Sequence, residues 1–171
     1  TLKRMNRKYT TEEYLEKCGI LRKYFDRPAI TTDVIVGFPG ETEEEFEKTR
    51  AFLEQVHFYE MHVFKYSRRK GTRADRMEGQ VPEPVKAERS DILLELEKKM
   101  SQEYRRGWLG EEVDVLLEEE AVMDGKPVMT GCTGEYVKCA VEQKPWMTKG
   151  MMVRGTAVRL SENGVMEVAV R

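Results

Sequence analysis

A short segment that ends in a glycine-rich turn is the part of this sequence best suited to chemistry. Residues 30–36 finish in three apolar, β-branched side chains, with Asp33 just before them, and are followed by Gly37, Pro39 and Gly40. In α/β proteins, a strand that feeds a helix through glycines carries ligands at its carboxyl end, because glycine lets the backbone approach a bound molecule closely. We therefore expect a ligand site at this turn.

A basic loop after the next predicted strand is the second candidate. Residues 66–76 contain five basic side chains and one acid, Asp75. The hydroxyl groups of Ser67 and Thr72 stand beside a glycine among these arginines, an arrangement that suits a phosphate or a carboxylate. A solvated basic loop is the alternative. We favour the binding role because both loops follow strands and so converge on one edge.

Two predicted helices and two predicted strands must position these loops. Threonine capping residues and helical spacing of apolar residues predict helices over about 11–24 and 42–56. The second strand is expected within 57–66. Such alternation implies parallel strands joined by crossover helices. Because two strands are too few for a parallel sheet, residues 1–80 are expected to be the C-terminal portion of a larger barrel.

The remainder is predicted to hold a long helix and a small β domain. Residues 81–108 contain a proline-rich break and a long helix whose charges are expected mostly to face solvent. Residues 109–171 contain five short strands separated by glycine turns, which is typical of a small antiparallel barrel of the oligonucleotide-binding kind. Such barrels bind nucleic acid through basic and aromatic residues, for which Tyr136 and Lys138 are candidates. A packing or dimerisation module is the alternative.

Composition narrows the classes of function. The chain has 171 residues and a formal net charge of −2, so nucleic-acid binding must depend on local patches. No apolar run approaches the length of a membrane span. The three cysteines and two histidines fit no zinc or cluster spacing. We expect free thiols in a reduced cytoplasm and no metal site.

Three segments of the sequence resemble the radical S-adenosylmethionine methylthiotransferases. They are residues 2–14, 32–42 and 62–72, with the motifs Leu-Lys-Arg-Met-Asn-Arg, Asp-Val-Ile-Val-Gly-Phe-Pro-Gly-Glu and Tyr-Ser-x-Arg-x-Gly-Thr. The first and third are most similar to the bacterial branch that acts on N6-threonylcarbamoyladenosine at position 37 of tRNA. The C-terminal part resembles the family's TRAM domain, with the pattern Gly131-x-Thr133-x-x-Tyr136.

This resemblance implies a tRNA-modifying enzyme of the cytoplasm that works on the anticodon loop. The family inserts a sulfur and a methyl group at C2 of the modified adenine. It uses S-adenosylmethionine and two 4Fe–4S clusters. One cluster, held by a CxxxCxxC motif, cleaves S-adenosylmethionine, and the other, held by upstream cysteines, takes part in sulfur delivery.

The sequence departs from this family in its cysteines. It has no CxxxCxxC motif, and Cys18, Cys132 and Cys139 match no cluster ligand. We therefore expect a C-terminal fragment of such an enzyme that by itself binds no cluster and contains no catalytic residue. An incomplete barrel would leave a strand edge open, and we expect that edge to favour dimerisation.

The resemblance also assigns site residues. Asp33 would accept hydrogen bonds from ribose hydroxyls, and residues 34–36 would pack beside the adenine. The residues expected to bind the cofactor are Asp33, Ile35, Gly37, Pro39, Gly40 and Glu41. Those expected to bind RNA or substrate are Tyr66, Ser67, Arg69, Gly71, Thr72, Tyr136 and Lys138. Lys65 and Arg73 stand where the family often has proline.

Other functions remain open on the sequence alone. The branches that act on isopentenyladenosine in tRNA or on a ribosomal protein share much of this scaffold. A non-catalytic RNA-binding module that kept the scaffold is a further alternative.

Overall fold

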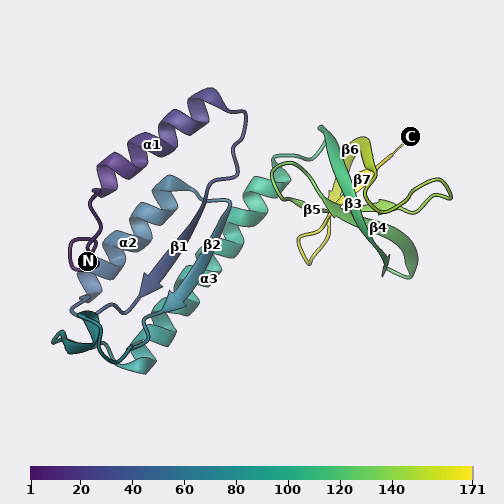
Figure 1. Cartoon of the computed structure of the whole chain (residues 1–171). Coiled ribbons are helices and arrows are strands. Elements are labelled where there is room, and N and C mark those ends of the chain that lie inside the picture. Colours follow the sequence, from purple (N-terminus) through teal and green to yellow (C-terminus); the bar gives the residue numbers. More distant parts are fainter. Residues whose placement is uncertain (171) are drawn as a thin grey trace. The chain divides into compact units, whose positions relative to one another are not determined.

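The chain folds into two compact units. The computed structural model, shown in Figure 1, describes residues 1–170. Unit 1 covers Thr1–Ser101, and unit 2 begins at Gln102. Unit 1 contains a two-stranded sheet with helices, and unit 2 contains five strands, so the predicted mixture of α and β structure is confirmed. Within residues 1–170, no helix has both the length and the apolar character needed to cross a membrane.

Unit 1 alternates helices and strands. Its elements are α1 (Thr11–Tyr24), β1 (Thr31–Val36), α2 (Glu43–Val56), β2 (Glu60–Lys65), the 3-10 helix η1 (Ala74–Arg76) and α3 (Glu83–Arg106). β1 and β2 run parallel, with Asp33 opposite His62 and Val36 opposite Lys65. The predicted parallel pair with a crossover helix is thus confirmed, and η1 is the element that the sequence did not predict.

Both shorter helices begin at threonine caps, as predicted. The side chains of Thr10 and Thr42 each accept a hydrogen bond of 3.2 Å, from the backbone N–H of Glu13 and of Glu45 respectively. Each glutamate carboxylate accepts the threonine N–H in return. These reciprocal bonds satisfy donors that the first helical turn cannot, which fixes where β1 ends and α2 starts.

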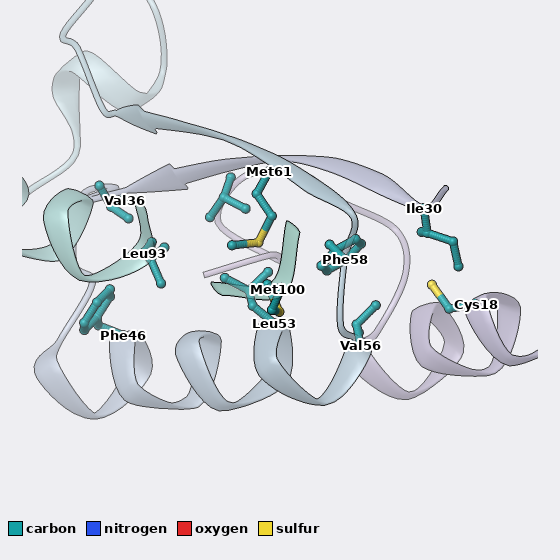
Figure 2. Close-up of a cluster of buried hydrophobic side chains, with 11 residues drawn as sticks. Cys18, Ile30, Val36, Phe46, Leu53, Val56, Phe58, Met61, Leu93 and Met100 are labelled. Carbon is teal, nitrogen blue, oxygen red and sulfur yellow. The ribbon is translucent and has the colours of Figure 1, made fainter. Parts of the chain in front are cut away.

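The core of unit 1 lies between the sheet and the helices α2 and α3. Figure 2 shows apolar side chains that converge from the strands (Val36, Met61), from α2 (Phe46, Leu53, Val56) and from α3 (Leu93, Met100). Each fully buried aliphatic or aromatic side chain contributes about 1.5–3 kcal/mol relative to an exposed one. α3 is therefore a structural part of unit 1.

The charged side chains of α3 mostly face solvent, as expected, with two exceptions. The long helix, expected within residues 81–108, spans Glu83–Arg106. Two of its basic side chains are buried, with Lys86 only 3% exposed and Arg89 only 5%. A buried charge is costly unless it is paired, so these residues must have partners within the fold.

Unit 2 is a five-stranded sheet that closes on itself through strand pairing. Its strands are β3 (Glu112–Met123), β4 (Lys126–Cys132), β5 (Lys138–Glu142), β6 (Met152–Leu160) and β7 (Met166–Ala169). They pair in the order β3-β4-β5-β7-β6, and β6 returns to pair with β3. Five strands were predicted, but the expectation of a wholly antiparallel barrel is wrong for β5 and β7, which are parallel. β6 reverses the chain between them, so both enter the sheet in the same direction.

Candidate functional site

A cavity of about 1080 Å³ in unit 1 brings together the two loops that the sequence singled out. It runs along β1, where residues 32–35 line it, and its other walls come from the N-terminal segment, from α2, from the end of β2 and from the loop after β2. β1 pairs only with β2 among the described strands, so its other edge is open toward this cavity. The site therefore extends along β1 and includes Phe38 and Glu41 of the segment that follows the carboxyl end of this strand.

The turn formed by residues 37–41 (turn 37–41) owes its shape to two glycines and one buried carboxylate. Gly37 and Gly40 have φ angles of +71° and +80°, which residues with a Cβ rarely adopt. The Gly37 N–H donates to Oε2 of Glu41 over 2.7 Å, and the Gly40 N–H donates to the carbonyl of Gly79 over 2.8 Å. The Glu41 side chain, only 3% exposed, thus braces the turn from within.

Arg89 of helix α3 anchors this turn through hydrogen bonds. The Arg89 Nη1 donates to Glu41 Oε2 over 2.7 Å and to the Glu41 carbonyl over 3.2 Å. Its Nη2 donates to Glu43 Oε2 over 2.9 Å, and its guanidinium lies 5.2 Å from the ring centre of Phe46. One buried arginine therefore bridges the end of the turn and the first residue of α2.

Lys86 links α3 to the second loop. Its Nζ donates to the carbonyl of Tyr66 over 2.9 Å and to Oε1 of Glu83 over 2.7 Å. The stem of the lysine passes under Gly37, where an added Cβ would lie 2.3 Å from Lys86 Cγ. Gly37 is therefore required both for its backbone angle and for the space that the lysine occupies.

Tyr66 presents an unsatisfied polar atom at the cavity. Its N–H continues the strand pairing by donating to the carbonyl of Val36 over 2.8 Å, and its ring meets Phe38 edge-on at 5.3 Å. Its hydroxyl is buried and has no hydrogen-bond partner within residues 1–170. Since buried polar groups are nearly always bonded, the missing partner makes this hydroxyl an exception among the described residues.

The loop of residues 66–76 folds on itself through its acidic residue. Arg68 Nε donates to Asp75 Oδ1 over 3.1 Å, and the Asp75 N–H donates to the hydroxyl of Thr72 over 3.2 Å. The Thr72 hydroxyl in turn donates to the carbonyl of Arg69 over 2.8 Å. The acid of this loop is thus used internally, which leaves the Arg69 side chain facing the cavity.

The cavity carries an excess of positive charge. Its basic lining residues that make no ion pair within the described chain are Lys3, Arg7, Lys65 and Arg69. Of its acids, Glu41 is paired with Arg89 and Glu45 with Arg4, whereas Asp33 has no basic partner among these residues. The Arg4 guanidinium, 2.6 Å from Glu45, lowers the pKa of that carboxyl to about 2. An anionic group of a ligand, such as a carboxylate or a phosphate, is therefore favoured beside these basic side chains.

The structure places most of the predicted site residues at this cavity. Those that line it are Asp33, Ile35, Glu41, Tyr66, Ser67, Arg69 and Thr72. Gly37, Pro39, Gly40 and Gly71 are not among the lining residues and act through the shape of the turns. Val36 was expected beside the adenine, but its side chain is fully buried in the core because strand residues alternate between faces.

Several lining residues were missed by the sequence reasoning. Phe38 and Phe64 line the cavity, and Phe64 is 52% exposed. Arg7 lines it as well; it ends the motif Leu-Lys-Arg-Met-Asn-Arg, but it was not named as a site residue. No local sequence signal was available for Phe64, because an aromatic residue at the end of a strand can face either the core or solvent.

Tyr136 and Lys138 belong to unit 2. Tyr136 has a φ angle of +62° and is 81% exposed. The turn that projects it is held by Thr133, whose hydroxyl accepts the N–H of Glu135 over 3.2 Å and of Val137 over 3.4 Å. The Gly131-x-Thr133-x-x-Tyr136 pattern is thus a turn that presents a large aromatic side chain to solvent.

The cysteines do not fit an iron–sulfur cluster. Cys18 and Cys139 are buried, and burial raises the pKa of the Cys139 thiol to about 12. A cluster needs thiolates that converge on one point. Within residues 1–170, no three or more histidine, cysteine, aspartate or glutamate side chains gather closely enough to hold a metal ion.

Comparison with known proteins relates the chain to enzymes that act on tRNA. Residues 1–53 match the model of the Radical SAM superfamily. A tRNA-2-methylthio-N(6)-dimethylallyladenosine synthase of Acetivibrio thermocellus is 41% identical over 169 residues, which are 90% of this chain and 35% of that protein. The threonylcarbamoyladenosine tRNA methylthiotransferase MtaB of Bacillus subtilis is 44% identical over 138 residues, 80% of this chain and 31% of that protein.

A relative from another bacterium has a similar sequence identity and coverage. The MtaB protein of Thermotoga maritima is 46% identical over 137 residues, which are 80% of this chain and 31% of that protein. The chain thus spans about a third of the length of the curated relatives that it matches.

Proposed function

Because this chain is homologous to the radical SAM tRNA methylthiotransferases, we propose that it supplies part of the cofactor and substrate sites of an enzyme that methylthiolates adenosine in tRNA. The observation that carries the proposal is the cavity of unit 1. There, turn 37–41 and the loop of residues 66–76, both in segments similar to the family, meet around an unsatisfied tyrosine hydroxyl and unpaired cations.

The proposed substrate is N6-threonylcarbamoyladenosine at position 37 of tRNA. A threonyl group carries a carboxylate, whereas a dimethylallyl group is an uncharged hydrocarbon. The cations of the cavity that lack an ion pair suit the former. The second candidate is N6-dimethylallyladenosine, favoured by the 50% identity over 116 residues to the synthase of Aquifex aeolicus.

S-adenosylmethionine is the proposed cofactor at turn 37–41. The Asp33 carboxylate would accept the ribose hydroxyls, Ile35 and Phe38 would pack beside the adenine, and the Tyr66 hydroxyl would donate to a polar atom. These residues line one cavity, and its size fits a nucleoside together with a second small molecule. When bound, S-adenosylmethionine would supply the methyl group and the radical chemistry of the family.

Unit 2 is proposed to be a TRAM domain of the oligonucleotide-binding type that holds the anticodon loop of tRNA. Its strand order, with one parallel pair in a closed ring, supports this assignment, and so does the exposure of Tyr136. The Tyr136 ring would stack on a base, and the Lys138 ammonium would approach a phosphate. A packing module without RNA contacts is the competing role for this unit.

The proposed division of labour can be tested in the full-length parent enzyme. Asp33→Ala is expected to lower cleavage of S-adenosylmethionine at least about fivefold while tRNA affinity stays within about twofold, because a lost pair of ribose hydrogen bonds is worth about 1–3 kcal/mol. Asp33→Asn, which keeps an acceptor, should lose less. Cleavage is measured as 5′-deoxyadenosine released, and unchanged cleavage in Asp33→Ala would remove the assignment of this turn.

Tyr136→Ala is expected to lower tRNA affinity and to leave cleavage of S-adenosylmethionine largely unchanged. Loss of one stacked base should weaken tRNA binding about tenfold, since base–aromatic stacking is worth about 1–3 kcal/mol. The matched control is Tyr24→Ala, because Tyr24 is also exposed but lies on α1. Filter binding over a range of salt concentrations measures the affinity, which should fall steeply with salt. A salt-independent affinity, or equal effects of both variants, would contradict the RNA-binding role of unit 2.

A further inference from the structure

Two basic side chains of α3 reach the candidate site without lining its cavity. Lys86 and Arg89 stand one helical turn apart and are 3% and 5% exposed. Neither is among the residues that border the cavity. Each contacts a different loop of the site, since Lys86 bonds to Tyr66 and Arg89 bonds to Glu41.

The first contact fixes the position of turn 37–41. Oε2 of Glu41 accepts two hydrogen bonds of 2.7 Å, one from the Gly37 N–H and one from Arg89. The arginine also bonds to the Glu41 carbonyl and to Glu43, so its planar group spans the turn and the start of α2. A guanidinium can hold two carboxylates in a fixed geometry, whereas an ammonium is a single point charge.

The second contact fixes the loop after β2 relative to the same turn. The Lys86 ammonium holds the Tyr66 carbonyl, while the carbon stem of the lysine occupies the space left by the absent Cβ of Gly37. The tyrosine ring packs edge-on against Phe38 of the turn. The side chains that border the cavity from the two loops are therefore placed by one rigid helix.

We infer that Lys86 and Arg89 are positioning residues, which clamp turn 37–41 and the Tyr66 loop in the arrangement that receives the adenosine portion of S-adenosylmethionine. This inference rests on the proposed function for the identity of the ligand. The clamp itself follows from the contacts of the two side chains. Its removal loosens the turn while the core between β1, α2 and α3 stays packed.

Amide hydrogen exchange in the 171-residue chain tests the clamp directly. Arg89→Met should speed exchange at Gly37 and Gly40 at least tenfold more than at the amides of α2, because the turn loses its brace whereas the helix keeps its own bonds. A merely structural role would speed all protected amides by the same factor. Lys98→Met is the matched control, since Lys98 is an exposed residue of the same helix.

If Arg89→Met does not fold, two variants that remove fewer contacts can still test the clamp. Arg89→Lys retains the charge but cannot bridge Glu41 and Glu43 together, so turn exchange should speed about threefold. Lys86→Met retains the stem under Gly37 but loses the ammonium, so the effect should appear in residues 66–67 and not in turn 37–41. Uniform or unchanged exchange in both variants would overturn the clamp.

Equilibrium binding of S-adenosylmethionine to the full-length parent then tests the identity of the ligand independently of the clamp. Arg89→Met or, if that variant does not fold, Arg89→Lys should bind at least fivefold more weakly than the parent, and Lys98→Met should bind as the parent does. Absence of binding to the unaltered parent would refute the cofactor assignment. The amide hydrogen exchange rates would still test whether Lys86 and Arg89 clamp the two loops. Equal affinities of the parent and the folded Arg89 variant would refute the positioning role.

Discussion

Gly37→Ala is expected to destabilise unit 1 by about 2–5 kcal/mol. A residue with a Cβ in the left-handed region costs about 1–2 kcal/mol, and forcing atoms into a packed space costs about 1–3 kcal/mol. Both penalties apply at Gly37, where φ is +71° and the new Cβ would lie 2.3 Å from Lys86 Cγ. The helices α1, α2 and most of α3 belong to unit 1, so urea unfolding followed by far-ultraviolet circular dichroism reports the change.

A glycine in open space provides the control for this substitution. Gly71 has a φ of +88°, but nothing lies within 4 Å of its added Cβ. Gly71→Ala should therefore show the backbone penalty alone, about 1–2 kcal/mol. The double variant Gly37→Ala/Lys86→Ala should recover part of the loss through relief of the collision. Equal losses in Gly37→Ala and Gly71→Ala would show that Lys86 does not fill this space.

Gly131→Ala is expected to destabilise unit 2 by about 3 kcal/mol, and to leave unit 1 unchanged. An added Cβ on Gly131 would lie 1.9 Å from the carbonyl oxygen of Leu116 and 3.2 Å from the Cα of Leu117. These are backbone atoms of the neighbouring strand β3, which cannot turn aside as a side chain can. The strand pair would have to separate, at the upper end of the usual cost of overpacking.

The two tryptophans give a readout that is specific to this unit. Trp108 is buried and Trp146 is half-exposed, and both lie in unit 2. Urea unfolding followed by tryptophan fluorescence should show an earlier transition for Gly131→Ala, while the helical signal of unit 1 keeps its midpoint. Gly134→Ala is the control, because nothing lies within 4 Å of its added Cβ. A matching loss in Gly134→Ala would mean that close strand approach is not the cause.

Local sequence signals predicted the elements of unit 1 because their causes lie within one helical turn or one strand. Thr10 and Thr42 fix helix starts through bonds to residues three positions later. The apolar run of β1 and the glycines after it define a strand that ends in a turn. Seven of the predicted cofactor and substrate residues therefore fall on one cavity.

The parts that failed depend on distant partners. The charges of α3 are mostly solvated, as expected, but the sequence did not single out Arg89, which is buried against Glu41, 48 residues earlier in the chain. No periodicity in the helix distinguishes a lysine that faces water from one that packs beneath a glycine of another element. The parallel pairing of β5 and β7 likewise depends on how β6 returns through the sheet.

The sequence by itself determined that residues 30–42 form a strand, a glycine-rich turn and a capped helix, since turn formation by glycine and capping bonds are local. It also determined the resemblance to methylthiotransferases, because that resemblance resides in short motifs. Only the tertiary structure decided that Glu41 braces the turn, that Tyr66 presents a buried hydroxyl, and that α3 holds both loops. Those facts arise from burial, which depends on which segments the fold brings into contact.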